Sequence, residues 1–310
     1  MALFFGVGTM LANCSSTPFN VNHQEHTIML TMKQTLKAAV AAIGVAGAMS
    51  ANAFVVGGID FGSALNLSHL ETATMAQTFI NGNGQTAMSY GSVSTVNGSN
   101  SYCAGGGSCG LYYVASFGNS QNFTGGYVEF TTATISVFYT NTNVNLLTQN
   151  SVQNLATIQA MTPWLTLTGH NNLGGGAAPN AVLNGTGSFS GQVLNGFGGG
   201  LFDVSVAGPG VAAVAAAFNT NTVADAATGF ADVQLTSSFS NFVLNANDEA
   251  AGLAAGCKTG TAAAGAWCYQ GTTNLRGTLQ PLPEPASLAL VGLGLGVAGV
   301  LSRRRRTVSK

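Results

Sequence analysis

Apolar and polar residues alternate along several stretches of the chain between residues 54 and 280. The clearest of these stretches cover residues 111–117, 132–139, 202–206 and 232–236. Many of their apolar positions are β-branched or aromatic, as in Tyr113, Phe117, Ile135 and Val137. A period of two with such residues is typical of half-buried antiparallel strands. We therefore predict a mainly β protein.

Several Asn-Gly pairs occur in the same region of the chain. They include Asn81-Gly82, Asn97-Gly98, Asn184-Gly185 and Asn195-Gly196. Asn-Gly is the dipeptide that tight hairpin turns favour, because both residues tolerate positive φ. Many short strands separated by such turns predict an antiparallel β-sandwich.

One or two short helices are expected within this β-domain. Ser151 is expected to cap the first helix, and Asn247 the second. Asp248 and Glu249 follow Asn247, and acids in the first turn interact favourably with the helix dipole. Residues 211–218 are rich in alanine but lie among strands, so they fit a helix or a strand.

The last thirty residues, 281–310, have a different pattern. Pro283, Glu284 and Pro285 precede an apolar run over residues 286–301. The run with Ser302 would span about 25 Å as a helix, near the lower limit for crossing a bilayer core. A basic cluster follows, made of Arg303, Arg304, Arg305 and Arg306. Arginines are expensive to move across a membrane, so we predict a short transmembrane helix with a cytoplasmic stop-transfer cluster.

This order of motif, helix and basic cluster resembles the PEP-CTERM sorting signal of Gram-negative bacteria. The resemblance implies an exosortase as partner, which cuts near Pro283-Glu284-Pro285 after transient anchoring in the inner membrane. It further implies release to the cell surface or extracellular matrix. The alternative is an ordinary C-terminal tail anchor.

The N-terminal part divides at Met32. Residues 1–31 are expected to be a non-native extension, caused by a start codon placed too early. Residues 32–53 have the pattern of a signal peptide, with Lys33 and Lys37 ahead of an apolar stretch. Ala51 and Ala53 form an A-x-A cleavage site, so export through the Sec translocon would leave Phe54 as the first mature residue.

The remaining segment, residues 54–280, is long enough for one sizeable core. It is poor in charge and acidic, with eight acidic residues against Lys258 and Arg276, a net charge of −6. Two cations cannot neutralise a row of phosphates, so nucleic acid is not an expected partner. Its solubility must come mainly from Asn, Ser, Thr and Gln, which suits a hydrated, carbohydrate-like environment.

Four cysteines remain in this segment, as two local pairs. We predict disulfides Cys103–Cys109 and Cys257–Cys268, because export leads to an oxidising compartment and both spacings are short. Four cysteines allow three connectivities. A zinc site is the alternative, but the spacings fit no C-x-x-C pattern and no histidine lies nearby.

Candidate catalytic chemistry is sparse. The only histidines of the segment are His69 and His170, and no serine lies in G-x-S-x-G. His170 is interpreted as a solvated loop residue, and Asp225 and Asp232 as surface charges. No calcium-loop pattern occurs. We therefore expect no enzyme, no catalytic residue, no metal and no cofactor.

A second resemblance concerns residues 183–244. The strings 200–204, 218–222, 229–232 and 237–239 look like the pattern of flocculation-associated PEP-CTERM proteins. This implies a structural or adhesive role in exopolysaccharide-dependent aggregation. One alternative is a carbohydrate-binding module in which Trp164, Trp267 or Tyr269 stacks on sugar rings. The other is a secreted hydrolase.

Overall fold

A computed structural model describes residues 54–63, 67–171, 180–190, 193–225, 229–242 and 244–280. The segments expected to be an extension (1–31), a signal peptide (32–53) and a sorting signal (281–310) lie outside the described residues. The strands are β1 (Val55–Val56), β2 (Ile59–Asp60), β3 (Leu67–Thr78), β4 (Ala87–Val96), β5 (Gly110–Thr124), β6 (Tyr127–Thr140), β7 (Thr162–Gly169), β8 (Leu183–Ser190), β9 (Val193–Val204), β10 (Val223–Asp225), β11 (Gly229–Ala231), β12 (Val233–Ser240) and β13 (Trp267–Thr278). The helices are α2 (Ser151–Gln159), α3 (Ala212–Phe218) and α4 (Ala246–Ala250), with short 3₁₀ turns at Ala104–Gly106 and Leu146–Thr148.

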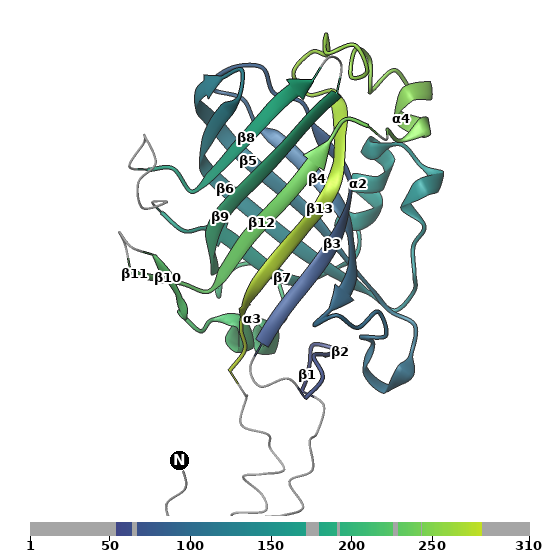
Figure 1. Cartoon of the computed structure of the whole chain (residues 1–310). Helices are drawn as coiled ribbons and strands as arrows, with labels where there is room; N and C mark the ends of the chain where they lie inside the picture. The colour runs from purple at the N-terminus through teal and green to yellow at the C-terminus, as the bar shows by residue number, and fades with distance from the viewer. Residues whose placement is uncertain are drawn as a thin grey trace, which may run out of the picture. The chain divides into compact units, whose positions relative to one another are not determined.

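The long strands form one antiparallel sheet that closes on itself (Figure 1). Its order is β12-β13-β3-β4-β5-β6-β7-β9-β8, with further pairings of β12 with β9 and of β6 with β8. β7 and β8 occupy one position between β6 and β9, because β7 pairs with one end of each and β8 with the other. The sheet is therefore barrel-like, with eight strand positions.

The predicted β-sandwich is not confirmed. A sandwich keeps two separate sheets, whereas here β9 is paired with β12 along one edge and with β8 and β7 along the other. Alternation along a strand cannot distinguish these architectures, because both bury one face of every strand. The register shifts in β3 and β13, at bulges or irregularities, help such long strands to curve.

One end of the barrel is filled by large side chains. The β1–β2 hairpin and α3 lie at this end, as Figure 1 shows. Trp164 is fully buried here, and its Nε1 donates to the Gly57 carbonyl at 2.9 Å. Its ring packs against Phe61 and Phe218, with centroids 6.5 and 5.8 Å away. Residues 211–218, ambiguous in sequence, thus include a helix that helps to close this end.

The two predicted helices form, but with different caps. α2 begins after Asn150, which forms a capping box with Gln153. α4 begins after Asn245, whose side chain accepts from the Asn247 backbone N–H. Ser151, the expected first cap, is instead buried inside the first turn of α2. Each helix therefore starts one or two residues earlier than the sequence indicated. No described helix is long and apolar enough to span a bilayer.

Both expected disulfides, Cys103–Cys109 and Cys257–Cys268, are present. Cys257 and Cys268 are buried in an apolar cluster with Leu194 and Tyr269. This bridge ties the segment after α4 to the start of β13.

We expect replacement of Cys257 and Cys268 by serine to lower the free energy of unfolding by about 3 kcal/mol. The reason is that the bridge closes a loop of roughly a dozen residues in the unfolded chain. Urea denaturation under oxidising conditions measures the change. A double variant as stable as the wild type would show that the bridge does not constrain the unfolded chain.

Candidate functional site: the barrel cavity

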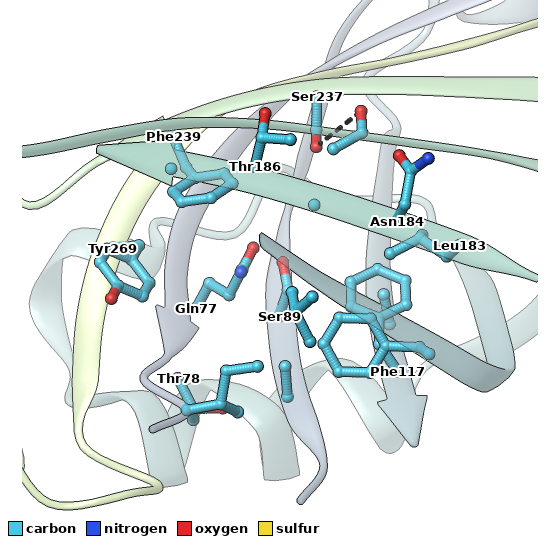
Figure 2. A pocket seen from close by; sticks show the side chains of 18 of the residues that line it. Gln77, Thr78, Ser89, Phe117, Leu183, Asn184, Thr186, Ser237, Phe239 and Tyr269 are labelled. Atoms are coloured by element: carbon cyan, nitrogen blue, oxygen red, sulfur yellow. Dashed lines mark hydrogen bonds between the residues drawn. The ribbon is translucent and has the colours of Figure 1, made fainter. Parts of the chain in front are cut away.

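The barrel contains a partly open cavity of about 190 Å³, and Figure 2 shows some of the side chains that line it. Residues from β3, β4, β5, β6, β8, β9, β12 and β13 line it. The cavity extends to the exposed turn between β5 and β6, where it is bordered by Thr124, Gly125 and Gly126. The strands of the closed sheet therefore form the walls of the cavity, and the β5–β6 hairpin borders it on one side.

Glycines on β8 and β9 leave room for this cavity. Gly185 pairs with Gly198, and Gly187 pairs with Gly196. Gly185, Gly187 and Gly198 line the cavity without a side chain, whereas the space beside Gly196 is taken by the Phe239 ring. Two of these glycines belong to Asn-Gly pairs, Asn184-Gly185 and Asn195-Gly196, which were predicted to be turns. They lie inside strands instead. The i, i+2 spacing of these glycines was the available sequence signal for an inner face without side chains.

The walls of the cavity are mostly apolar. Phe117, Leu183, Leu235 and Leu275 are at most 8% exposed and line it. Near them, the rings of Phe239 and Tyr269 lie 5.3 Å apart (Figure 2). A Cβ at Gly196 would lie 2.2 Å from the Phe239 ring, so this glycine allows the ring to pack against the wall. Burial raises the pKa of the Tyr269 phenol, which therefore stays neutral.

A group of hydroxyls lies among these apolar walls. The Tyr113 hydroxyl is 2.6 Å from Thr74 Oγ1, and Thr74 Oγ1 is 3.4 Å from Thr273 Oγ1. Burial raises the pKa of Tyr113, although the hydroxyls of Ser89 and Thr74 oppose that shift. Thr72 is 3% exposed, and its hydroxyl lies close enough to the same phenol to oppose this shift as well. Among the described residues, however, Thr72 Oγ1 has no partner that meets strict hydrogen-bond geometry.

The β5–β6 hairpin beside the cavity is held by a buried carboxylate. Glu129 is fully buried, accepting from the Tyr127 hydroxyl at 2.7 Å and from Asn122 Nδ2 at 2.6 Å. Burial of the phenol, together with its bond to Glu129 and the charge of that carboxylate, raises the pKa of Tyr127 to about 12. Tyr127 also lines the cavity, so this pair fixes part of its border.

The lining has no ionisable acid or base other than tyrosine. Among the described residues that form it, none is Asp, Glu, His, Lys or Arg. A charged ligand would lose its hydration there without gaining a counter-ion. The geometry therefore suits a neutral, largely apolar molecule with one hydrogen-bonding group.

The two histidines of the domain lie outside this cavity and apart from each other. His170 Nδ1 is 2.7 Å from Asp203 Oδ2, and its Nε2 is 3.7 Å from Asp225 Oδ2. With a side chain 12% exposed, His170 is not the solvated loop residue that we expected. His69 Nε2 contacts Asn274 Oδ1 at 2.8 Å. Strands β9, β12 and β13 separate the two imidazoles, roughly 19 Å along the sheet.

Two acidic residues that the sequence indicated as surface or helix-cap residues are buried, and their carboxylates accept hydrogen bonds from backbone N–H groups. Asp232, 2% exposed, accepts from the backbone N–H groups of Val204, Thr220 and Asn221 at 2.7–2.8 Å. Asp248, fully buried, accepts from the Ser151 N–H and hydroxyl at 2.6 Å. Asp225, 9% exposed, is also not a surface charge. Buried carboxylates require such donors, so at least Asp232 and Asp248 serve the fold.

The outward positions of β8, β9, β12 and β13 form a second candidate, which we name the outer polar face. These strands lie side by side in Figure 1. The face consists of Thr186, Ser188, Asn195, Phe197, Gln234, Thr236, Ser238, Thr272, Asn274 and Arg276. Phe197 is 67% exposed, and its partners on the neighbouring strands are Thr186 and Ser238. The Ser238 hydroxyl is in turn 3.1 Å from the Thr272 hydroxyl on β13.

The aromatic residues that the carbohydrate-binding alternative would place against sugar rings are not on the surface. Trp164 is fully buried, and Trp267 and Tyr269 are each 7% exposed. Trp267 packs against Tyr90 under α2, and Tyr269 lines the cavity. The sequence did not single out Phe197, because exposure of one aromatic residue in a strand depends on which face turns outward.

The sorting residues, namely Pro283, Glu284, Pro285, Arg303, Arg304, Arg305 and Arg306, and the cleavage residues Ala51 and Ala53 lie outside the described residues. Residues 281–306 match the family model of the PEP-CTERM protein-sorting motif. No curated protein and no solved structure matches the chain. The chain thus carries a PEP-CTERM sorting motif at its C-terminus, as the resemblance indicated. The motif implies an exported, membrane-transiting protein that an exosortase processes.

Proposed function

We propose that this protein is a structural or adhesive component of the cell surface or extracellular matrix, active in exopolysaccharide-dependent aggregation. The sorting motif supports the destination. The observation that carries the role is the outer polar face, where hydroxyl and amide side chains surround the exposed ring of Phe197. Such a surface offers hydrogen bonds to sugar hydroxyls and one apolar ring for a sugar face.

A non-catalytic role is part of this proposal. A hydrolase needs ionisable groups that converge on one bond. In the described residues His69 and His170 lie on separate parts of the sheet, and Asp232 and Asp248 are occupied with backbone donors. His170 does lie beside Asp203 and Asp225, but this group is outside the lining of the cavity. We therefore expect the purified protein to turn over no polysaccharide.

The resemblance to flocculation-associated proteins supports the same role, although its strings include structural residues. Asp232, in the third string, accepts from the backbone of Val204 in the first and of Thr220 and Asn221 in the second. The first three strings therefore contain residues whose hydrogen bonds to Asp232 stabilise this part of the barrel. The outer polar face, which includes Ser238 of the fourth string, is where contact with the polysaccharide is proposed.

Phe197→Ala is expected to weaken binding of the processed protein to the exopolysaccharide of its own strain by roughly tenfold, because the only large ring of the outer polar face is lost. Phe230→Ala is the matched control, since Phe230 is 57% exposed on β11, outside that face. Sedimentation with purified polysaccharide measures binding, and settling of cells that carry each variant measures aggregation. Equal binding by both variants would contradict the assignment of this face, and normal settling of a deletion strain would contradict the aggregation role.

A further inference from the structure

We propose that the barrel cavity binds one small neutral molecule that is apolar over most of its surface and carries one hydroxyl or carbonyl group. This site lies on the inner side of the sheet, whereas the outer polar face lies on its outer side. The proposal therefore goes beyond a role in aggregation and does not depend on it.

The first argument is capacity. An eight-stranded barrel is wide enough either to be filled by its own side chains or to hold one small ligand. Here Gly185, Gly187 and Gly198 line a space of about 190 Å³ that no side chain of the described residues fills. An apolar cavity of roughly 150 Å³ is enough for benzene in another protein. The cavity therefore accommodates a molecule with a single ring or a short chain.

The second argument is the hydroxyl of Thr72. Its Oγ1 is buried at the cavity wall and, although it lies near the Tyr113 phenol, has no partner with good hydrogen-bond geometry among the described residues. Buried polar groups are nearly always paired, because an unpaired one loses its hydration without compensation. A ligand hydroxyl or carbonyl would supply the missing partner.

The third argument is the distribution of polarity. Phe117, Leu235 and Leu275 offer apolar contacts, while Thr72, Ser89 and Tyr113 place hydroxyls in the same cavity. Ligand pockets typically combine such apolar walls with a few polar groups that fix orientation. Because the described lining lacks charged side chains, it selects against ions.

Calorimetric titration of the processed protein with benzyl alcohol and with toluene tests the proposal. Both probes fit the cavity, but only benzyl alcohol can pair with Thr72. We expect benzyl alcohol to bind with 1:1 stoichiometry and about tenfold more tightly than toluene, the effect of one hydrogen bond. Failure of both probes to bind would overturn the proposal, and equal affinities would overturn the role of Thr72.

Thr72→Val separates a ligand-binding role from a structural one. Valine has nearly the same shape without the hydroxyl, so the variant loses a buried polar group that lacks a well-aligned partner in the cavity wall. We expect the variant to melt at a higher temperature than the wild type, to bind toluene equally well and to bind benzyl alcohol about tenfold more weakly. A lower melting temperature with unchanged binding of benzyl alcohol would show that the hydroxyl serves the fold.

Gly185→Leu tests the location of the site. A Cβ at Gly185 would lie 3.4 Å from Val128 Cγ1, an ordinary contact, so the rest of the leucine extends into the cavity. We expect at least a tenfold loss of affinity for both probes. Thr134→Leu, at an exposed position of β6 outside both the cavity lining and the outer polar face, is the control and should bind normally. Far-ultraviolet circular dichroism and thermal melting confirm that each variant is folded. Binding by a folded Gly185→Leu protein at wild-type affinity would place the probe elsewhere.

Discussion

Replacing Asp232 with alanine is expected to lower the free energy of unfolding by roughly 3–5 kcal/mol. The substitution leaves three backbone N–H groups, those of Val204, Thr220 and Asn221, without their acceptor. Each such donor costs on the order of 1–3 kcal/mol when it stays buried, and water can reach some of these groups in the variant. Because domains of this kind are stable by about 5–15 kcal/mol, the loss is a large part of the total.

Asp60→Ala is the matched control for this experiment. Asp60 is only partly buried, and its side chain accepts from the Gly62 N–H at 2.7 Å, a contact within one turn. We expect this variant to lose no more than about 1 kcal/mol. Urea denaturation followed by tryptophan fluorescence measures both. If the two substitutions cost the same, Asp232 does not hold the region between α3 and β12 in the way the hydrogen bonds indicate.

Replacing Pro283, Glu284 and Pro285 together with alanine is expected to abolish release of the protein from the membrane. The apolar run and the arginines that follow the motif remain, so the chain still stops in the membrane. What is lost is the Pro-Glu-Pro sequence of the matched sorting motif, near which we predict the exosortase to cut. Cell fractionation and the intact mass of the released protein measure this effect.

The control for sorting replaces Thr307, Val308 and Ser309 with alanine. These residues lie beyond the matched motif, after the last arginine, so processing should be normal. Release of the motif variant at the level of this control would show that Pro283-Glu284-Pro285 is not the processing signal.

The sequence predicted the strands well, because alternation of apolar and polar side chains reports directly which face of a strand is buried. Residues 111–117 lie in β5 and residues 232–236 mostly in β12. The closure of the sheet was not predictable from the same pattern. It depends on pairing between distant segments, such as Leu67 of β3 with Thr278 of β13, and local sequence does not encode that partner.

The cavity was missed for a related reason. A glycine after asparagine favours a turn when considered locally, and Asn97-Gly98 does form one, with φ of 49° and 80°. At Gly185 and Gly196 the same dipeptide lies within paired strands, where the missing side chain matters more than the backbone freedom. Likewise, the burial of Asp232 is invisible in sequence, since its donors come from segments 11 to 28 residues away.

The position of β13 has a consequence for the timing of folding. This strand is the last of the barrel, yet it lies between β12 and β3, and β3 is the first long strand. The β3–β13 pairing joins residues about 200 positions apart, and contacts of such long sequence separation form slowly. Only Leu279 and Gln280 separate the end of β13 from the matched sorting motif. During export the barrel therefore cannot close until β13 has crossed the membrane, so translocation of this strand and completion of the fold become a single late event.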